Sequence, residues 1–176
     1  MTDISVFSLE AIGVWIVAFF IMEFPMRYLY LKFGQSDYLN RWYGFKEFSP
    51  FNVIISDLFY MLVGLIIAYR IHAYFFANIK DPLTKFALLF GVFWIVQIVG
   101  DLLFYQIISR LGKGNKWIRF FQDYGKSARF SAILGDSAYI LVWALTAYAI
   151  HGLSKDILVA LFFLYVLILS ILSEQL

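Results

Sequence analysis

The sequence predicts an all-α integral membrane protein with five transmembrane helices, and three observations lead to this fold class. Of the 176 residues, 62% are hydrophobic and only 15% are charged, and the mean hydropathy is +0.79. A soluble domain carries about 25% charged residues and could not bury so much apolar side chain. The apolar residues also gather in runs of about 20 residues, the length that an α-helix needs to cross a bilayer. These runs lack the alternation of barrel strands.

Five apolar runs follow one another along the chain. The predicted spans are Ser8–Lys32, Phe51–Ala77, Leu83–Arg110, Arg129–His151 and Asp156–Ser173. The first run has no basic segment before it, and Glu23 and Arg27 interrupt it, so we interpret it as a span rather than a cleaved signal peptide. We expect a single transmembrane domain over residues 1–176.

The basic residues predict the orientation of these spans. Ten of the 14 Lys and Arg residues lie in the first and third loop regions, and the positive-inside rule places those loops in the cytoplasm. The N-terminus is then outside and the C-terminus inside, in a cellular, organelle or viral membrane. A net charge of +2 argues against nucleic acid as a partner. The chain has no cysteine, which excludes disulfides and thiolate chemistry.

Two cytoplasmic segments, residues 37–48 and 113–126, interleave aromatic and basic side chains. One interpretation is an aromatic belt together with topology-setting charges. The other is a short interfacial helix that binds anionic lipid headgroups. The candidate headgroup-binding residues are Arg41, Trp42, Lys46, Lys113, Lys116, Trp117 and Arg119.

The chain contains an internal repeat. Residues 51–72 and 130–151 align without a gap at an offset of 79 and share ten of 22 residues. The identical polar pairs are Asp57 and Asp136, Tyr60 and Tyr139, Tyr69 and Tyr148, and His72 and His151. We therefore predict a duplicated two-helix hairpin, over residues 1–77 and 83–151, with residues 156–176 as an appended helix. Two hairpins of the same orientation would form a four-helix bundle with a pseudo-two-fold axis along the membrane normal.

Each of the first four spans carries one acidic residue away from its ends. These acids are Glu23, Asp57, Asp101 and Asp136, and each lies six to nine residues from the inner end of its span. A rise of about 1.5 Å per residue puts all four at a similar depth, about 10–14 Å into the inner leaflet. The supporting residues that we expect beside them are Tyr60, Tyr105, Tyr139, Gln97 and Arg27.

Three functions are compatible with this carboxylate layer. Buried carboxylates become protonated or hold a cation, and acids inside spans mark ion and proton pathways. The first hypothesis is therefore a channel-like or transporter-like protein that handles protons or a small cation, with a bound cation as its one expected cofactor. The second is a structural or assembly protein held together by Asp–Tyr hydrogen bonds, either as a homo-oligomer or in a larger assembly. The third is an embedded enzyme acting on a lipid or isoprenoid, although no nucleophile–base constellation supports it.

The two histidines lie 15 residues beyond their aspartates, about 22 Å further along each helix. His72 and His151 are therefore candidates for an outer metal site or a pH sensor, or for simple hydrogen bonding to water and headgroups. Spans that begin with Ser/Gly-Asp-x-x-Tyr, as at Ser56–Tyr60 and Gly135–Tyr139, resemble small multispan proteins encoded by large DNA viruses of algae and protists. The resemblance covers most of the chain and implies no activity and no residue roles.

Overall fold

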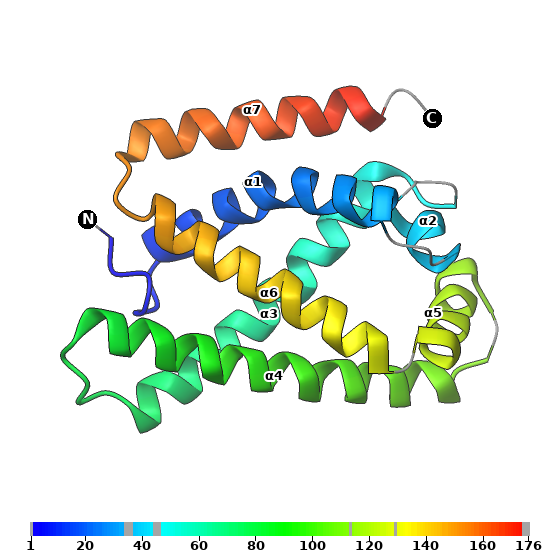
Figure 1. The fold of residues 1–176 in the computed structure, drawn as a ribbon, viewed down its shortest axis with the longest axis horizontal. Helices are drawn as coiled ribbons and strands as arrows, with labels where there is room; N and C mark the ends of the chain where they lie inside the picture. The colour runs from blue at the N-terminus through cyan, green and yellow to red at the C-terminus, as the bar shows by residue number, and fades with distance from the viewer. Residues whose placement is uncertain (1, 34–36, 44–46, 113, 129, 174–176) are drawn as a thin grey trace.

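The computed structural model describes residues 2–33, 37–43, 47–112, 114–128 and 130–173. Within these ranges the chain forms helices and no strand, which confirms the all-α prediction. The helices are α1 (Leu9–Phe33), α2 (Asp37–Tyr43), α3 (Pro50–Phe75), α4 (Pro82–Arg110), α5 (Lys116–Ala128), α6 (Phe130–Ile150) and α7 (Lys155–Ser173) (Figure 1).

Four of the described helices are long and apolar enough to cross a membrane. These segments are Leu9–Tyr30, Pro50–Phe75, Pro82–Arg110 and Ala132–Ile150, within α1, α3, α4 and α6. They are compatible with an integral membrane location. The fifth predicted span corresponds to α7, which is not among these four, so the five-span topology stays a prediction.

Two of these four helices begin at a capping residue followed by proline. The side chains of Ser49 and Asp81 accept hydrogen bonds from the backbone N–H three residues further on, at 3.3 Å and 2.8 Å. The proline that follows each cap occupies the first helical turn, where its missing N–H is not needed. Local chemistry therefore defines where α3 and α4 start.

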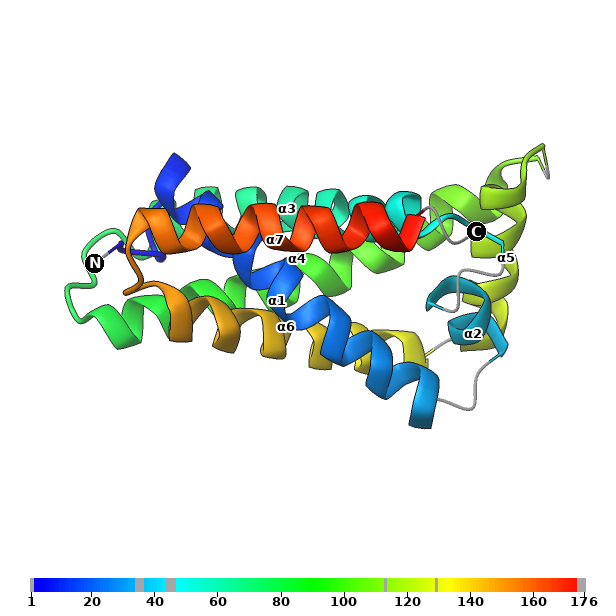
Figure 2. The same cartoon turned by 90° about the horizontal axis from the view of Figure 1, so that it is seen from above.

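The long helices pack in two close pairs, α1 against α6 and α3 against α4. Helix α7 lies along α1 and α3 on the outside of the bundle (Figures 1 and 2). The short helices α2 and α5 lie together at one end of the bundle, and the loops that connect α3 to α4 and α6 to α7 lie at the other (Figure 1). We call these the α2–α5 end and the loop end.

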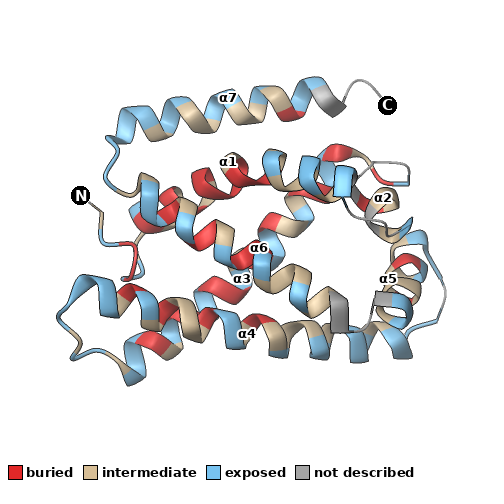
Figure 3. Ribbon diagram, viewed as in Figure 1, coloured by how far each residue is buried: buried red, intermediate tan, exposed pale blue. Residues whose placement is uncertain are grey.

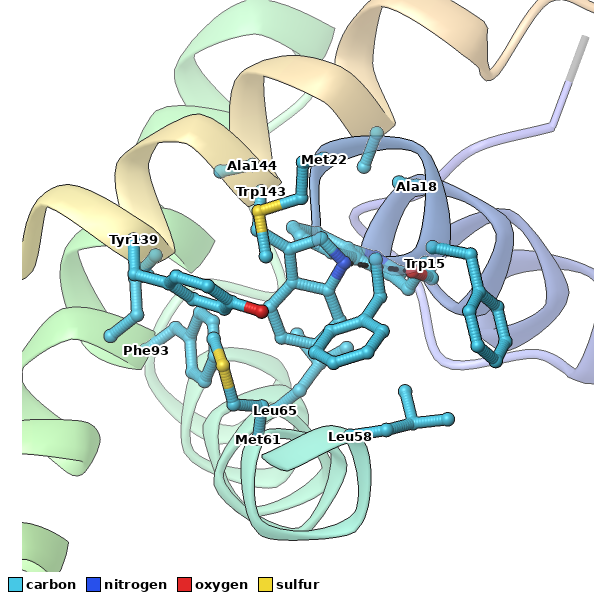
Figure 4. Close-up of a cluster of buried hydrophobic side chains, with 14 of the residues drawn as sticks. Trp15, Ala18, Met22, Leu58, Met61, Leu65, Phe93, Tyr139, Trp143 and Ala144 are labelled. Carbon is cyan, nitrogen blue, oxygen red and sulfur yellow. Dashed lines mark hydrogen bonds between the residues drawn. The ribbon is translucent and has the colours of Figure 1, made fainter. Parts of the chain in front are cut away.

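The centre of the bundle is filled by an aromatic plug, which comprises Trp15, Phe19, Phe93 and Trp143. All four side chains are at most 1% exposed. The rings of Trp15 and Trp143 pack edge to face with centroids 5.0 Å apart, and the Trp143 indole donates to the Trp15 carbonyl at 2.7 Å. Burial is concentrated in this central region (Figures 3 and 4). Along α6, the plug separates Asp136 from His151.

The residues before α1 close the loop end of the bundle. The Ile4 carbonyl accepts hydrogen bonds from the Tyr69 hydroxyl at 2.7 Å and from the Trp15 indole at 3.4 Å. Nearby, Asp3 and Lys85 form an ion pair at 3.0 Å. The N-terminal segment is therefore fixed to α1, α3 and α4.

Candidate functional site

A large cavity lies at the α2–α5 end, between the long helices α1, α3, α4 and α6 and the two short helices. Its volume is about 1360 Å³. Three of the four acids found in the spans line it: Asp57, Asp101 and Asp136. We call it the carboxylate cavity.

Glu23, the fourth acid, is not part of the cavity wall. Its side chain is fully buried, and its Oε2 accepts a hydrogen bond from the hydroxyl of Tyr139. The Oε1 atom is also buried and has no hydrogen-bond partner among the described residues. Arg27 acts on Glu23 electrostatically from one turn away. This contact joins α1 to α6 and is an interhelical tie.

One of the two carboxylate oxygens of Asp101 accepts hydrogen bonds from neighbouring side chains. Its Oδ1 accepts hydrogen bonds from the Tyr60 hydroxyl at 2.7 Å and from the Gln97 side-chain amide at 2.9 Å. Its Oδ2 is buried and receives no hydrogen bond from the described part of the chain. Asp101 therefore both ties α4 to α3 and leaves one oxygen unsatisfied at the cavity wall.

Asp57 and Asp136 occupy equivalent positions in the predicted repeat but have different surroundings. The Asp57 Oδ2 accepts a hydrogen bond from the Trp42 indole at 3.1 Å, which fastens α2 to α3. The Asp136 carboxylate is half-buried and receives no hydrogen bond from any described residue. Asp136 is thus the carboxylate most available to a ligand in the cavity.

The side of the cavity formed by α2 and α5 is aromatic. This aromatic wall comprises Tyr38, Trp42, Trp117, Phe120, Phe121 and Tyr124, all of which line the cavity. The rings hold the two helices together, with the centroids of Trp42 and Phe120 stacked 5.1 Å apart. Burial, followed by the negative charges of Asp136, Asp101 and Asp57, raises the pKa of the Tyr124 hydroxyl. Tyr124 in the aromatic wall therefore lies close enough to the three carboxylates to be affected by their charge.

Glycines allow close approach at two points around the cavity. A Cβ on Gly125 of α5 would lie 2.2 Å from the ring of Tyr105 on α4, so α5 packs onto α4 only because this position has no side chain. A Cβ on Gly100 would lie 3.3 Å from the Tyr60 hydroxyl. The small residue before Asp101 therefore lets Tyr60 reach the carboxylate.

The predicted headgroup-binding residues have several different environments. Arg41 forms an ion pair with Glu47 at 2.7 Å, and the Lys116 ammonium donates to the Glu47 backbone carbonyl at 3.0 Å. Trp42 is buried at 7% exposure, and Trp117 lines the cavity. Arg119, Arg41 and Lys116 border a second, small surface cavity of about 270 Å³. Lys46 and Lys113 lie outside the described residues.

The two histidines lie at the loop end, away from the carboxylate cavity. His72 is 3% exposed, and its Nε2 has no hydrogen-bond partner in the part of the chain that the structure describes. The His151 Nδ1 lies close to the Tyr148 carbonyl. Among the described residues, no group of three His, Asp or Glu side chains could hold a metal ion. The metal or pH-sensing role of the pair stays a prediction.

The sequence predicts an interfacial position for the aromatic side chains of residues 37–48 and 113–126, whereas the structure places several of them around the acids. The signal was present, because Trp117, Phe120, Phe121 and Tyr124 recur at the spacing of one helix face. That spacing predicts that one side of α5 is covered. It does not indicate that this side of α5 lines a cavity that also contains carboxylates.

The fold and the cavity together define a helical protein with four helices long and apolar enough to cross a membrane, and with a carboxylate-lined and aromatic-lined cavity at one end of its bundle. Comparison of the chain with protein-family models, with curated proteins and with solved structures gives no match.

Proposed function

We propose that this membrane protein binds a cation in the carboxylate cavity, and that Asp136 is the principal charged contact. The observation that carries the proposal is the Asp136 carboxylate, which lines a cavity of about 1360 Å³ without a hydrogen bond from any described residue. A carboxylate in a low-dielectric site has a strong need for a proton or a cation. Asp57 and the unsatisfied Oδ2 of Asp101 add to the negative potential.

The protein supplies little positive charge to this cavity. Lys126, on an exposed position of α5, is the basic side chain among the lining residues that the structure describes. Three carboxylates therefore face the cavity beside one ammonium group at its rim. A mobile cation is the natural compensating charge.

The aromatic plug bears on how such a cation would move. Trp15, Phe93 and Trp143 fill the bundle between the carboxylate cavity and the loop end. We therefore propose binding from the α2–α5 end and no passive leak through the bundle. Transport would require the plug to rearrange, as in the alternating exposure of a central site.

The pattern of tyrosine–acid contacts favours the proposed repeat. Tyr60 of α3 donates to Asp101 of α4, and Tyr139 of α6 donates to Glu23 of α1. Exchange of the two hairpins would convert one contact into the other. It would also interconvert the two close helix pairs, α3 with α4 and α1 with α6. We infer that the duplicated hairpins form a two-fold-related bundle.

The same contacts favour a second function, a structural role in a membrane or a larger assembly. In that case the acids serve as interhelical hydrogen-bond acceptors, as Glu23 and Asp101 do. Asp136 distinguishes the two functions, because it accepts no hydrogen bond from any described side chain and so has no structural contact of this kind. A purely structural role predicts that Asp136 is dispensable for any binding.

Cation binding to the purified full-length protein tests the proposal. We expect Na⁺, K⁺, Ca²⁺ or an organic ammonium salt to raise the melting temperature in maltoside detergent, and Asp136→Asn to abolish that effect. Asp156→Asn, an exposed acid at the start of α7, is the matched control and should respond like the wild type. Equal responses from both variants, or no response from the wild type to any cation, would contradict the proposal.

A further inference from the structure

The size of the carboxylate cavity limits which cation fits it. Binding pockets for organic ligands of drug size have volumes of about 300–1,000 Å³, and this cavity has about 1360 Å³. A dehydrated metal ion needs six to eight oxygen ligands at about 2.3–2.6 Å if it is Ca²⁺. The carboxylates come from three different helices, and no group of three acids or histidines among the described residues converges closely enough for a metal. The cavity is too wide, and its acids too dispersed, for a bare ion.

The aromatic wall supplies the other half of the recognition chemistry. Aromatic faces attract ammonium groups within about 6 Å of the ring centroid, and the attraction increases when water is excluded. The same cluster already attracts the protein's own cations on its outer side. The Arg41 guanidinium lies 5.2 Å from the centroid of the Tyr38 ring and 5.3 Å from that of the Phe120 ring.

We propose that the ligand of the carboxylate cavity is an organic ammonium compound, held between Asp136 on α6 and the ring of Tyr124 on α5. This inference rests on the proposed cation-binding function and names its ligand class. The ammonium group pairs with the Asp136 carboxylate. It is also attracted by the buried Oδ2 of Asp101, which accepts no hydrogen bond from the described residues. The apolar substituents of the ligand contact Trp117, Phe121 and the other rings of the aromatic wall.

The charge of the cavity also selects between two sources of ammonium groups. A free amine or quaternary ammonium ion brings only positive charge. A zwitterionic lipid headgroup brings a phosphate a few atoms from its ammonium group. That phosphate would enter a site with three carboxylates, where like charges repel strongly at low dielectric. The site therefore selects the free cation.

Isothermal titration of the full-length protein in dodecyl maltoside tests this inference, with choline as the probe and phosphocholine as its charge-altered counterpart. We expect choline to bind the wild type and Asp156→Asn. Asp136→Asn should weaken binding at least about 30-fold, the effect of truncating one member of a buried charge pair. Phosphocholine should not compete.

Two variants of Tyr124 distinguish binding by the aromatic ring from binding by the hydroxyl oxygen. Tyr124→Phe keeps the ring and should bind choline like the wild type, whereas Tyr124→Leu should weaken binding about three- to thirtyfold, as expected for a lost cation–π contact. Phe121→Leu provides the same comparison if the α5 packing does not tolerate Tyr124→Leu. Equal loss in Tyr124→Phe and Tyr124→Leu would overturn the aromatic part of the inference.

The remaining outcomes separate this inference from the proposed function. Binding of Na⁺ or Ca²⁺ that depends on Asp136, without choline binding, would overturn the organic ligand and leave the cation site intact. Phosphocholine binding as tight as that of choline would overturn the selection of a free ammonium ion in favour of a lipid headgroup. A wild type that binds none of these probes would contradict both the inference and the proposed function.

Discussion

The hydrogen bond between Tyr139 and Glu23 gives the sharpest stability prediction. Tyr139→Phe removes the donor and keeps the ring, which packs 6.2 Å from Phe19. Glu23 is fully buried, and its second carboxylate oxygen already has no hydrogen-bond partner among the described residues. The substitution therefore leaves the buried Glu23 carboxyl group without a hydrogen bond from any described residue to either oxygen.

The expected coupling energy follows from a comparison of this contact with the Tyr60–Asp101 contact. Interhelical hydrogen bonds in membrane proteins have coupling energies that average about 0.6 kcal/mol and reach about 1.7 kcal/mol. We expect the Tyr139–Glu23 pair to lie near the upper value, because both side chains are buried. The Tyr60–Asp101 pair should lie near the average, because Tyr60 is 37% exposed and Gln97 donates to the same oxygen.

Two double-mutant cycles measure these coupling energies. One combines Tyr139→Phe with Glu23→Gln, and the other combines Tyr60→Phe with Asp101→Asn. The free energy of unfolding is measured by reversible SDS titration in mixed micelles. We expect about 1.5 kcal/mol of coupling in the first cycle and about 0.6 kcal/mol in the second. Equal couplings, or a first cycle near zero, would refute the assignment of Glu23 as an interhelical tie.

Two further predictions concern packing and pH. Gly125→Ala should destabilise the protein by about 1–3 kcal/mol, because the new Cβ would lie 2.2 Å from the Tyr105 ring; Gly91→Ala, with nothing within 4 Å, should be neutral or stabilising in the same titration. Burial raises the pKa of Asp3, but hydrogen bonds and the charge of Lys85 lower it more, so that it lies below its ordinary value of 3.8. The stabilisation of the folded state by the ionised Asp3 is therefore complete above pH 3.8 and is lost as the pH falls through the lower pKa of the folded protein. Acid unfolding followed by circular dichroism should therefore show a weaker pH dependence below pH 3.8 for Asp3→Asn than for the wild type, and identical acid profiles would contradict the role of the ion pair.

Hydropathy predicts the helical class and the four helices that are long and apolar enough to cross a membrane, because apolar runs of about 20 residues are typical of membrane helices. The pattern of acids predicts one layer of four, Glu23, Asp57, Asp101 and Asp136. Asp57, Asp101 and Asp136 line the carboxylate cavity, whereas Glu23 lies outside its wall. These features depend on length and period, which a single sequence displays directly.

The different hydrogen-bond contacts of the four acids could not be predicted in the same way. Whether an acid is hydrogen-bonded within the protein or free to contact a ligand depends on donors from other helices. Examples are Trp42 of α2, which donates to Asp57, and Tyr139 of α6, which donates to Glu23. No spacing along the chain encodes those contacts. The cavity likewise depends on how α5 folds back against α4, which the close contact at Gly125 permits.

A structure of the full-length protein with its cation bound tests the central claim most directly. Determined in detergent with an excess of a quaternary ammonium salt, it should show ligand density in the carboxylate cavity next to Asp136 and against the ring of Tyr124. Density should be absent when Asp136→Asn is examined under the same conditions. An empty cavity in the wild type, or one filled by an acyl chain with Asp136 hydrogen-bonded to a neighbouring side chain, would contradict the account.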